Sequence, residues 1–446
     1  MSETTAPREY ELMDGVTLTV YPTDRFKVGL LSLSLLLPLE RERSPVRTLL
    51  FSVLRRGNEA YPTLEAGNRR LDELYATPYR VRNRELGCYQ CLGFSADLLG
   101  EQYLPEGTDL LGGVLSMMEQ MLFHPLLEEN RLTARYVDAE KKNTVDAIRS
   151  IKNHASAYAH AQLLERFYEG AQGGHLLCGT EEEITAVSVD ALTAQWHELL
   201  RTAPVRCFYV GPMEGEAVAA RLGEMLTRAF AGIGCPRVVL PLVKGCLPMP
   251  CARSTPQRFD TEHPSGQSHL LLGIRTGITC ASPEFYAMML CHEILGLSPI
   301  SRLFVHVREK HGLCYSCASE YHIDRGDIII RCGISEQNRE TAERAILEQL
   351  DVMRRGEFDD AEWNAARKSL ENSYRQVGDS TRSIANFYEL RAVLGVDQTP
   401  ASCRARFAAL TREQVIAAAQ HLTVDTVLFQ RGTDDEDGEE EGMDDV

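Results

Sequence analysis

The sequence predicts an α+β protein of the α/β sandwich type, in which helices cover a sheet. Two observations lead to this prediction. Strand-like and helix-like segments alternate along the chain, and the same order of strand, turn, capped helix and glycine occurs in both halves. The 446 residues suffice for two or more domains, and 44% apolar with 25% charged residues is ordinary for a globular protein.

The internal repeat rests on matching start and stop signals. Proline in the first helical turn and glycine just past the helix end are typical caps. The two prolines are 238 positions apart and the two glycines 239, so we expect a diverged duplication. The strand, proline and glycine are 30–37, Pro45 and Gly57 in the first half, and 268–274, Pro283 and Gly296 in the second.

The remaining segments complete two domains joined by a linker. Further helices are expected from apolar spacing at 110–122, 128–170, 187–200, 214–230, 340–355, 359–375 and 411–421, with a strand at 206–210. Proline and glycine density marks the linker. The predicted domains are residues 1–231 and 263–432, with the linker at 232–262 and a disordered acidic tail at 433–446.

Charge and composition exclude several classes of function. The net charge is −17, and nine of the acidic side chains lie in the tail, so nucleic acid is not expected as a partner. The longest apolar run, residues 35–39, is interrupted by Pro38, so no membrane span is expected. The thirteen cysteines are scattered and odd in number, and the first residues do not resemble a signal peptide. We therefore expect free thiols and a cytoplasmic location.

Residues 302–316 hold the most informative pattern. They predict an amphipathic helix, a turn at Gly312 and the start of a strand, with Arg308 and Tyr315 on either side of the turn. A guanidinium and a phenol directed at one point can hold a peptide carbonyl and its developing oxyanion. Taken alone, however, the pair is better explained as an exposed helix-end arginine and a half-buried strand tyrosine.

The residues around that pair resemble a sequence motif of a known family. Ser301-Arg302-Leu303-Phe304, Val307-Arg308-Glu309-Lys310 and Gly312-Leu313-x-Tyr315-Ser316 resemble a stretch of the pitrilysin/insulinase-like zinc peptidases, the inverzincins. The resemblance covers about residues 12–430. It implies two homologous metalloprotease-like domains, each a mostly antiparallel sheet covered by helices, that form half of a clamp. It also assigns substrate binding beside a zinc ion to Arg308 and Tyr315.

The zinc site of that family is missing from the matching positions. The family carries H-x-x-E-H on a helix, where two histidines one turn apart bind zinc and the glutamate activates water. Counting back from Gly57 places this box on residues 48–52, where Thr48, Phe51 and Ser52 replace the three functional residues. The distal glutamate falls on Ile148, or on Ala147 if the register slips by one. No metal or other cofactor is therefore expected in this chain.

Two C-x-x-C pairs, Cys88/Cys91 and Cys314/Cys317, suggest a metal or redox site at first sight. Both fall in expected strands, where residues three apart point to opposite faces, so a shared metal is not expected. Oxidation of Cys314 and Cys317 remains a minor hypothesis, because they flank Tyr315.

The resemblance is strongest to a bacterial subset with a degenerate zinc box and a kept Arg/Tyr pair. That subset includes proteins associated with elongation factor P modification and the non-zinc subunits of two-component peptidases. The expected function is the non-zinc subunit of a heterodimer, in which a homologous partner supplies the zinc and this chain orients the peptide substrate. The rival is an inert scaffold or peptide-binding protein of the same fold. A homodimer in isolation is left open.

Overall fold

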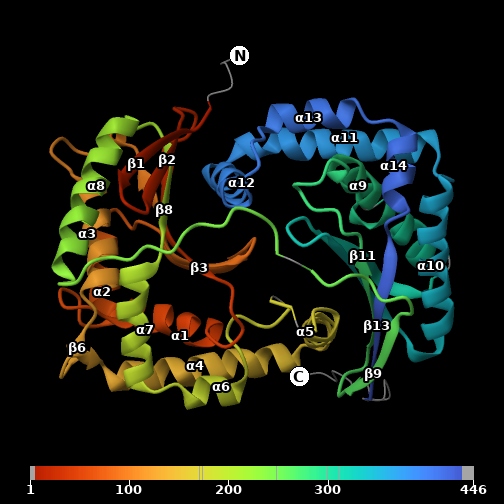
Figure 1. The fold of residues 1–446 in the computed structure, drawn as a ribbon, viewed down its shortest axis with the longest axis horizontal. Coiled ribbons are helices and arrows are strands. Elements are labelled where there is room, and N and C mark those ends of the chain that lie inside the picture. Colours follow the sequence, from red (N-terminus) through yellow and green to blue (C-terminus); the bar gives the residue numbers. More distant parts are fainter. Residues whose placement is uncertain are drawn as a thin grey trace, which may run out of the picture. The chain divides into compact units, whose positions relative to one another are not determined.

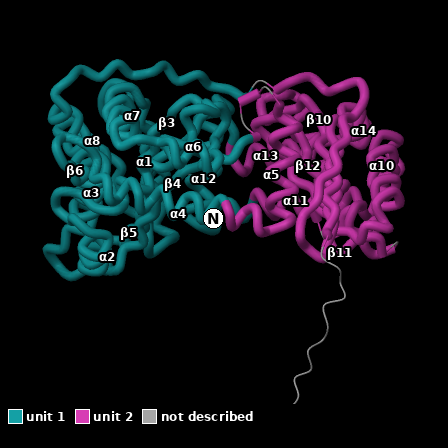
Figure 2. Tube along the Cα trace, turned by 90° about the horizontal axis from the view of Figure 1, so that it is seen from below, with its two compact units in different colours: residues 1–148, 175–247, 375–398 teal, residues 149–174, 248–374, 399–446 magenta. Residues whose placement is uncertain are grey.

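The computed structural model describes residues 6–433 apart from 170, 173, 248, 299 and 311. The chain divides into two compact units (Figure 2). Unit 1 comprises residues 1–148, 175–247 and 375–398, and unit 2 comprises 149–174, 248–374 and 399–446. Residues 1–5 and 434–446 lie outside the described residues, so the predicted disorder of the tail at 433–446 stays a prediction.

Unit 1 is a six-stranded sheet covered by helices (Figure 1). The strand order is β1-β2-β8-β3-β5-β4, and every pair is antiparallel except β2 with β8. Its strands are β1 Arg8–Met13, β2 Val16–Pro22, β3 Val28–Pro38, β4 Tyr79–Leu86, β5 Tyr89–Leu99 and β8 Val205–Gly211, with a small separate pair, β6 Leu127–Glu128 and β7 Arg131–Leu132. Its helices are α1 Ser44–Arg56, α2 Leu64–Glu73, α3 Leu110–Phe123, most of α4 Ala134–Asn153, α6 Glu181–Ala186, α7 Val189–Thr202, α8 Gly215–Gly232 and α12 Thr381–Leu394.

Unit 2 is a five-stranded sheet of the same design. The order is β11-β12-β10-β13-β9, and only β13 with β9 is parallel. Its strands are β9 Gln257–His263, β10 Ser268–Arg275, β11 Cys314–His322, β12 Asp327–Ile334 and β13 Thr423–Gly432. Its helices are α5 Ala155–Phe167, α9 Phe285–His292, α10 Arg339–Arg355, most of α11 Asp360–Gln376, α13 Pro400–Ala408 and α14 Arg412–Ala419, with π-helices Glu293–Leu297 and Leu303–Glu309.

The two sheets repeat one topology, which confirms the predicted duplication and fold class. In both, a central strand leads to a helix that begins near a Ser-Pro pair, and a hairpin then forms one edge of the sheet. Thus β3, α1 and the β4–β5 hairpin correspond to β10, α9 and the β11–β12 hairpin. The second helix does not stop at Gly296 as expected, because the π-helix Glu293–Leu297 continues α9 through that glycine.

The units differ from the predicted contiguous domains in two exchanged helices. Helix α5 precedes the linker yet packs on β10 and β13 in unit 2, and α12 follows the linker yet packs on β3 and β8 in unit 1 (Figure 1). The linker also differs from its predicted span. Residues 233–256 carry neither helix nor strand where they are described, but 257–262 belong to β9.

Local sequence explains the helix ends that position the site. Asp109 caps α3 by accepting a hydrogen bond from the Gly112 N–H, and Pro45 begins α1, which ends at Gly57. Among the described residues, no helix is both long and apolar enough to cross a membrane.

Candidate functional site

The segment that carries Arg308 folds as a helix, a turn and a strand, as the sequence predicts. The helix, Leu303–Glu309, is of the π type, and its wider turn is visible where the Lys310 N–H donates to the Val305 carbonyl at 2.9 Å. The Gly312 N–H donates to the Arg308 carbonyl at 3.0 Å, and Gly312 has a φ of 58°. This left-handed conformation favours glycine, so the turn depends on the residue at 312.

Arg308 and Tyr315 are both exposed. The Arg308 guanidinium carbon lies 4.7 Å from the Phe304 ring centroid, a cation–π contact between the end of the arginine side chain and a residue of the same helix. Tyr315 is 64% exposed and is one of the large hydrophobic residues left open to solvent. Tyr315 is therefore exposed, and not half-buried as the purely structural interpretation of the pair predicts.

A β-bulge explains why Tyr315 points outward. Cys314 pairs with Ile334 and Ser316 pairs with Gly333, so Tyr315 is an extra residue without a partner on β12. A bulge re-aims side chains and breaks the strict alternation of a strand. Consequently both Tyr315 and Ser316 are exposed, between the buried residues Cys314 and Cys317.

Strand β11 lies at the edge of its sheet, since β12 is its only neighbour in the strand order. An edge strand offers backbone N–H and C=O groups to which an extended peptide can add as a further strand. A phenol and a guanidinium at the start of such an edge could contact the carbonyl groups of that peptide. The chemistry available here is binding and orientation.

The expected zinc positions in unit 1 have other roles. Thr48 on α1 donates a hydrogen bond to the Leu177 carbonyl at 2.8 Å. The same hydroxyl accepts hydrogen bonds from Asn83 Nδ2 at 2.9 Å and Gln90 Nε2 at 3.2 Å. The first histidine position is thus a junction that joins α1, β4, β5 and the loop before α6.

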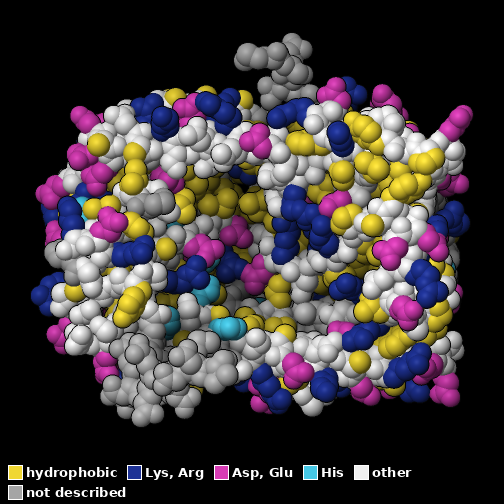
Figure 3. Space-filling model, turned by 180° about the vertical axis from the view of Figure 1, so that it is seen from behind, with side chains coloured by type: hydrophobic (Ala, Val, Ile, Leu, Met, Phe, Trp, Pro, Cys, Tyr) yellow, Lys and Arg dark blue, Asp and Glu magenta, His cyan; other side chains and the backbone are white. Residues whose placement is uncertain are grey.

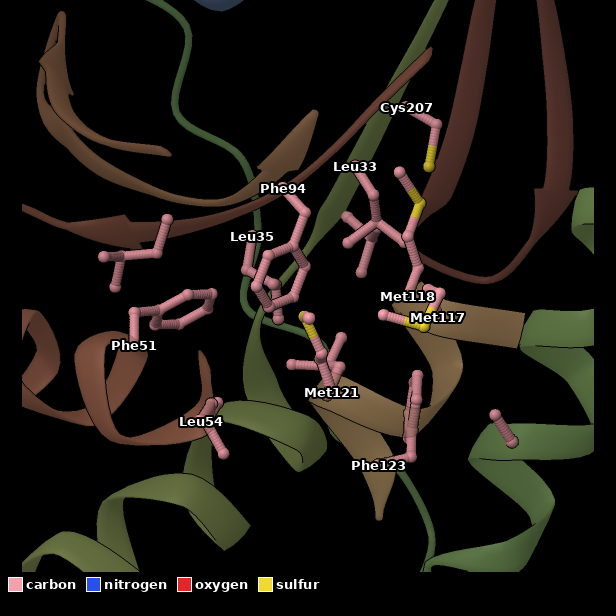
Figure 4. Packing of buried hydrophobic residues seen from close by; sticks show 14 of the residues in the cluster. Leu33, Leu35, Phe51, Leu54, Phe94, Met117, Met118, Met121, Phe123 and Cys207 are labelled. Carbon is pink, nitrogen blue, oxygen red and sulfur yellow. The ribbon is translucent and has the colours of Figure 1, made fainter. Parts of the chain in front are cut away.

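Phe51, at the position of the catalytic glutamate, belongs to the core. It is 1% exposed, and its ring centroid lies 5.5 Å from that of Phe94 on β5 (Figure 4). Ile148 on α4, at the distal ligand position, is 2% exposed and lies in the same apolar cluster. Neither side chain offers a metal ligand, and both fill space that a polar group could occupy only at a high cost.

Ser52, at the second histidine position, lines a pocket of about 260 Å³ with Arg55, Arg56, Glu140 and Asn143. Glu140 is ion-paired with Arg56 and also accepts from Asn143 Nδ2 at 3.2 Å. One hydroxyl and an occupied carboxylate do not form a zinc site. The residues at and around the predicted box therefore do not fit the metal that the family resemblance implies.

A buried ion-pair cluster in unit 1 was missed by the sequence analysis. Glu389 on α12 is 11% exposed and accepts from Arg82 Nη1 at 2.8 Å, and it is also paired with Arg84. Ser32 on β3 donates to Glu389 at 2.7 Å. Burial raises the pKa of Glu389, but the hydrogen bonds and charges of the two arginines outweigh it and lower the pKa below the ordinary value. The arginines alternate along β4, a weak signal that they share one face.

The prediction for Cys314 and Cys317 was wrong in its geometry. Regular alternation would place residues three apart on opposite faces, but the bulge at Tyr315 turns both thiols to the buried side. Their Sγ atoms and that of Cys332 all lie within 4.8 Å of one another. In the other pair, Cys91 lies in β5 and Cys88 in the turn before it.

His292, in the helix that corresponds to α1, is a buried, hydrogen-bonded residue. It is 2% exposed, its Nε2 lies 2.9 Å from Ser319 Oγ, and burial lowers its pKa to about 4.

The surface charge is mixed. On the face drawn in Figure 3, acidic and basic side chains are interspersed, and neither sign covers that face. That pattern, with the net charge of −17, is unlike a nucleic-acid-binding surface.

Comparisons with known proteins agree with this geometry. Residues 186–370 match the family model "Peptidase M16 inactive domain". The chain is 23% identical over 420 residues to "Probable inactive metalloprotease YmfF" of Bacillus subtilis, covering 94% of this chain and 96% of that protein. It is 24% identical over 272 residues to "Uncharacterized zinc protease YmxG" of the same organism, covering 60% of this chain and 62% of that one.

Solved structures share the fold over nearly the whole chain. A conserved protein from Enterococcus faecalis has a TM-score of 0.87 at 22% identity, covering 97% of this chain and all of that one. A peptidase M16 inactive domain from Pseudomonas fluorescens has a TM-score of 0.78 at 19% identity, covering 96% of this chain and 99% of that one. A chain of complex III2 from Candida albicans has a TM-score of 0.70 at 11% identity, covering 95% and 94%.

These matches run through both units, and the family model spans the junction between the two halves of the sequence. The chain therefore resembles the pitrilysin/insulinase-like M16 peptidases, with a match to the M16 inactive domain over residues 186–370 and a likeness to YmfF over nearly its whole length.

Proposed function

We propose that this chain is the non-zinc subunit of a two-component M16 peptidase, in which Arg308 and Tyr315 bind and orient the substrate peptide for a zinc-bearing partner. One asymmetry supports the proposal. The positions of the zinc box are occupied by core and hydrogen-bonded side chains, whereas the Arg/Tyr positions are exposed at a sheet edge.

The partner is a homologous chain that carries H-x-x-E-H. The likeness to YmxG, which is named a zinc protease, supports this proposal. The substrate adds to β11 as an extended strand, and a zinc ion held by the partner's H-x-x-E-H residues would supply the activated water for hydrolysis. This chain contributes the guanidinium and the phenol that hold that carbonyl group as charge develops on its oxygen.

Reconstitution tests the proposal. The chain is expressed with the H-x-x-E-H chain that co-purifies with it, and kcat/KM is measured on a peptide that the pair cleaves. Arg308→Ala and Tyr315→Phe are each expected to lower kcat/KM by about 10²-fold or more, with the complex intact by size-exclusion chromatography. Arg344→Ala on α10 and Tyr103→Phe in unit 1 change exposed residues elsewhere and are expected to leave the rate unchanged.

Two results would overturn it. Peptide cleavage by the isolated chain with added zinc would show that no partner is needed. Unchanged turnover in both Arg308→Ala and Tyr315→Phe would remove the role assigned to the pair.

The second candidate is a scaffold or peptide-binding protein without a part in catalysis. The likeness to a chain of a respiratory complex favours it, because there the fold occurs in a larger assembly. It predicts that both variants retain full turnover, and that deletion of the chain lowers the partner's abundance rather than its rate.

A further inference from the structure

Three buried thiols gather on the inner face of the β11–β12 hairpin. Cys314 and Cys317 come from β11 and Cys332 from β12, and these side chains are 9%, 4% and 1% exposed. Cys317 and Cys332 are direct cross-strand partners, and the bulge turns Cys314 to the same face. In the described part of the chain, this is the one group of three or more His, Cys, Asp or Glu residues close enough to hold a metal ion.

The spacing fits an ion after a small contraction. Sulfur ligands lie about 2.3 Å from zinc, so three of them around one ion are about 3.7–4.0 Å apart. The three Sγ atoms already lie within 4.8 Å of one another. Because two of the thiols sit on directly paired strand positions, the backbone holds them in place without the ion.

The three thiols interact with one another and with a nearby positive charge. The hydrogen bonds among them lower the pKa of Cys314 and raise the pKa of Cys317 and Cys332, so Cys314 is the thiol that loses its proton first. The positive charge of Arg308 acts on the pKa of Cys314 in the same direction. A thiolate is the form that binds metal. Three thiolates around one divalent cation carry a net charge of −1, and the positive charge of Arg308 would offset it.

We propose that Cys314, Cys317 and Cys332 form a binding site for a thiophilic d¹⁰ cation of the zinc(II) type, built across the bulge that presents Tyr315. Three thiolates leave one position of a tetrahedral ion for water. Binding releases the thiol protons, so the affinity falls as the pH is lowered. The site is separate from the H-x-x-E-H positions and does not depend on the proposed function.

Cadmium(II) titration of the reduced full-length chain under anaerobic conditions tests the site. The background carries Cys235→Ser and Cys251→Ser, which remove the two exposed thiols. One equivalent of cadmium is expected to produce the ultraviolet sulfur-to-metal charge-transfer band. Cys332→Ser is expected to weaken binding by at least about 100-fold, beyond what loss of an outer-shell contact causes. Cys291→Ala, a buried cysteine outside the cluster, is expected to bind as before.

Absence of the band in the background protein, or an unchanged titration in Cys332→Ser, would overturn the proposal. X-ray absorption is measured on the zinc-loaded variant that carries only Cys235→Ser and Cys251→Ser. This experiment keeps all three cluster cysteines, so it tests the site even if Cys332→Ser fails to fold. A shell of three sulfurs at about 2.3 Å supports the site, and a shell of nitrogen and oxygen alone contradicts it. Both experiments measure metal binding, so their outcome does not depend on the outcome of the peptidase assay.

Discussion

Helix α1 and the segment 303–316 are the two places where the family resemblance locates function, and they have opposite characters. On α1, Thr48 is tied by three hydrogen bonds and Phe51 is packed in the core. On the other segment, Arg308 is exposed on the π-helix Leu303–Glu309 and Tyr315 is exposed at a bulge. The first region serves stability, whereas the second exposes side chains that folding does not require.

The corresponding edge strands show the same contrast. On β4, Arg82 and Arg84 are held by Glu389 of α12. On β11, Tyr315 projects from the bulge toward solvent. The contrast lies in these residues: the two arginines of β4 are already bonded to a carboxylate, whereas the Tyr315 side chain is 64% exposed. Five substitutions test this contrast, in order of the expected effect.

Phe51→Glu, which restores the family's catalytic residue, is expected to have the largest effect. Loss of a buried phenylalanine to alanine costs about 3–5 kcal/mol, and the glutamate adds the cost of burying a charge. We therefore expect failure to fold, or a loss of unfolding free energy greater than in Phe51→Ala, measured by urea denaturation. A well-folded Phe51→Glu chain that binds zinc would show that α1 is still a latent metal site.

Glu389→Gln is expected to cost about 3 kcal/mol at neutral pH, because it leaves two arginines without their shared carboxylate. The pKa of Glu389 is lowered in the folded state, so its contribution is complete above the ordinary pKa of 4.5 and is lost as the pH falls through the lower folded value. The difference between the variant and the natural chain should accordingly shrink below about pH 4.5. A difference that is constant from pH 7 to 3 would contradict the assigned role.

Gly312→Ala is expected to cost about 1–2 kcal/mol, since its φ of 58° is unfavourable for a residue with Cβ. No atom lies within 4 Å of an added Cβ, so the cost is conformational and not steric. Gly107→Ala is a matched control in unit 1, with a positive φ and similarly open surroundings. If the turn aligns Arg308 with Tyr315, only Gly312→Ala also lowers turnover of the reconstituted pair.

Tyr315→Phe and Arg308→Ala are expected to change the unfolding free energy by less than about 0.5 kcal/mol, as is usual for exposed side chains. Thermal and urea unfolding of the isolated chain measure this. A loss above about 2 kcal/mol in either variant would mean that the segment is structural, and would remove the contrast with α1.

Local rules predicted much of the fold. Alternation and caps placed β3, β10, α1 and α3 close to their observed bounds, because proline, glycine and apolar spacing act within a few residues. They did not predict α12 at all, and they could not assign α5 to its sheet, since an apolar helix face does not specify which sheet it covers. They also missed the bulge, because an extra residue in a strand depends on the partner strand β12. The sequence pattern thus indicated the candidate residues Arg308 and Tyr315, but the thiol cluster could be recognised only in the structure.

The exchanged helices have a consequence for how the chain is made. During synthesis the first sheet lacks α12, whose residues 381–394 leave the ribosome only after most of unit 2. Until then the surface that receives Phe387 and Leu394 is open, so the nascent chain has an aggregation-prone period that chaperones must cover. For the same reason, a cut in the linker separates each sheet from one of its own helices, and neither fragment is a complete folding unit.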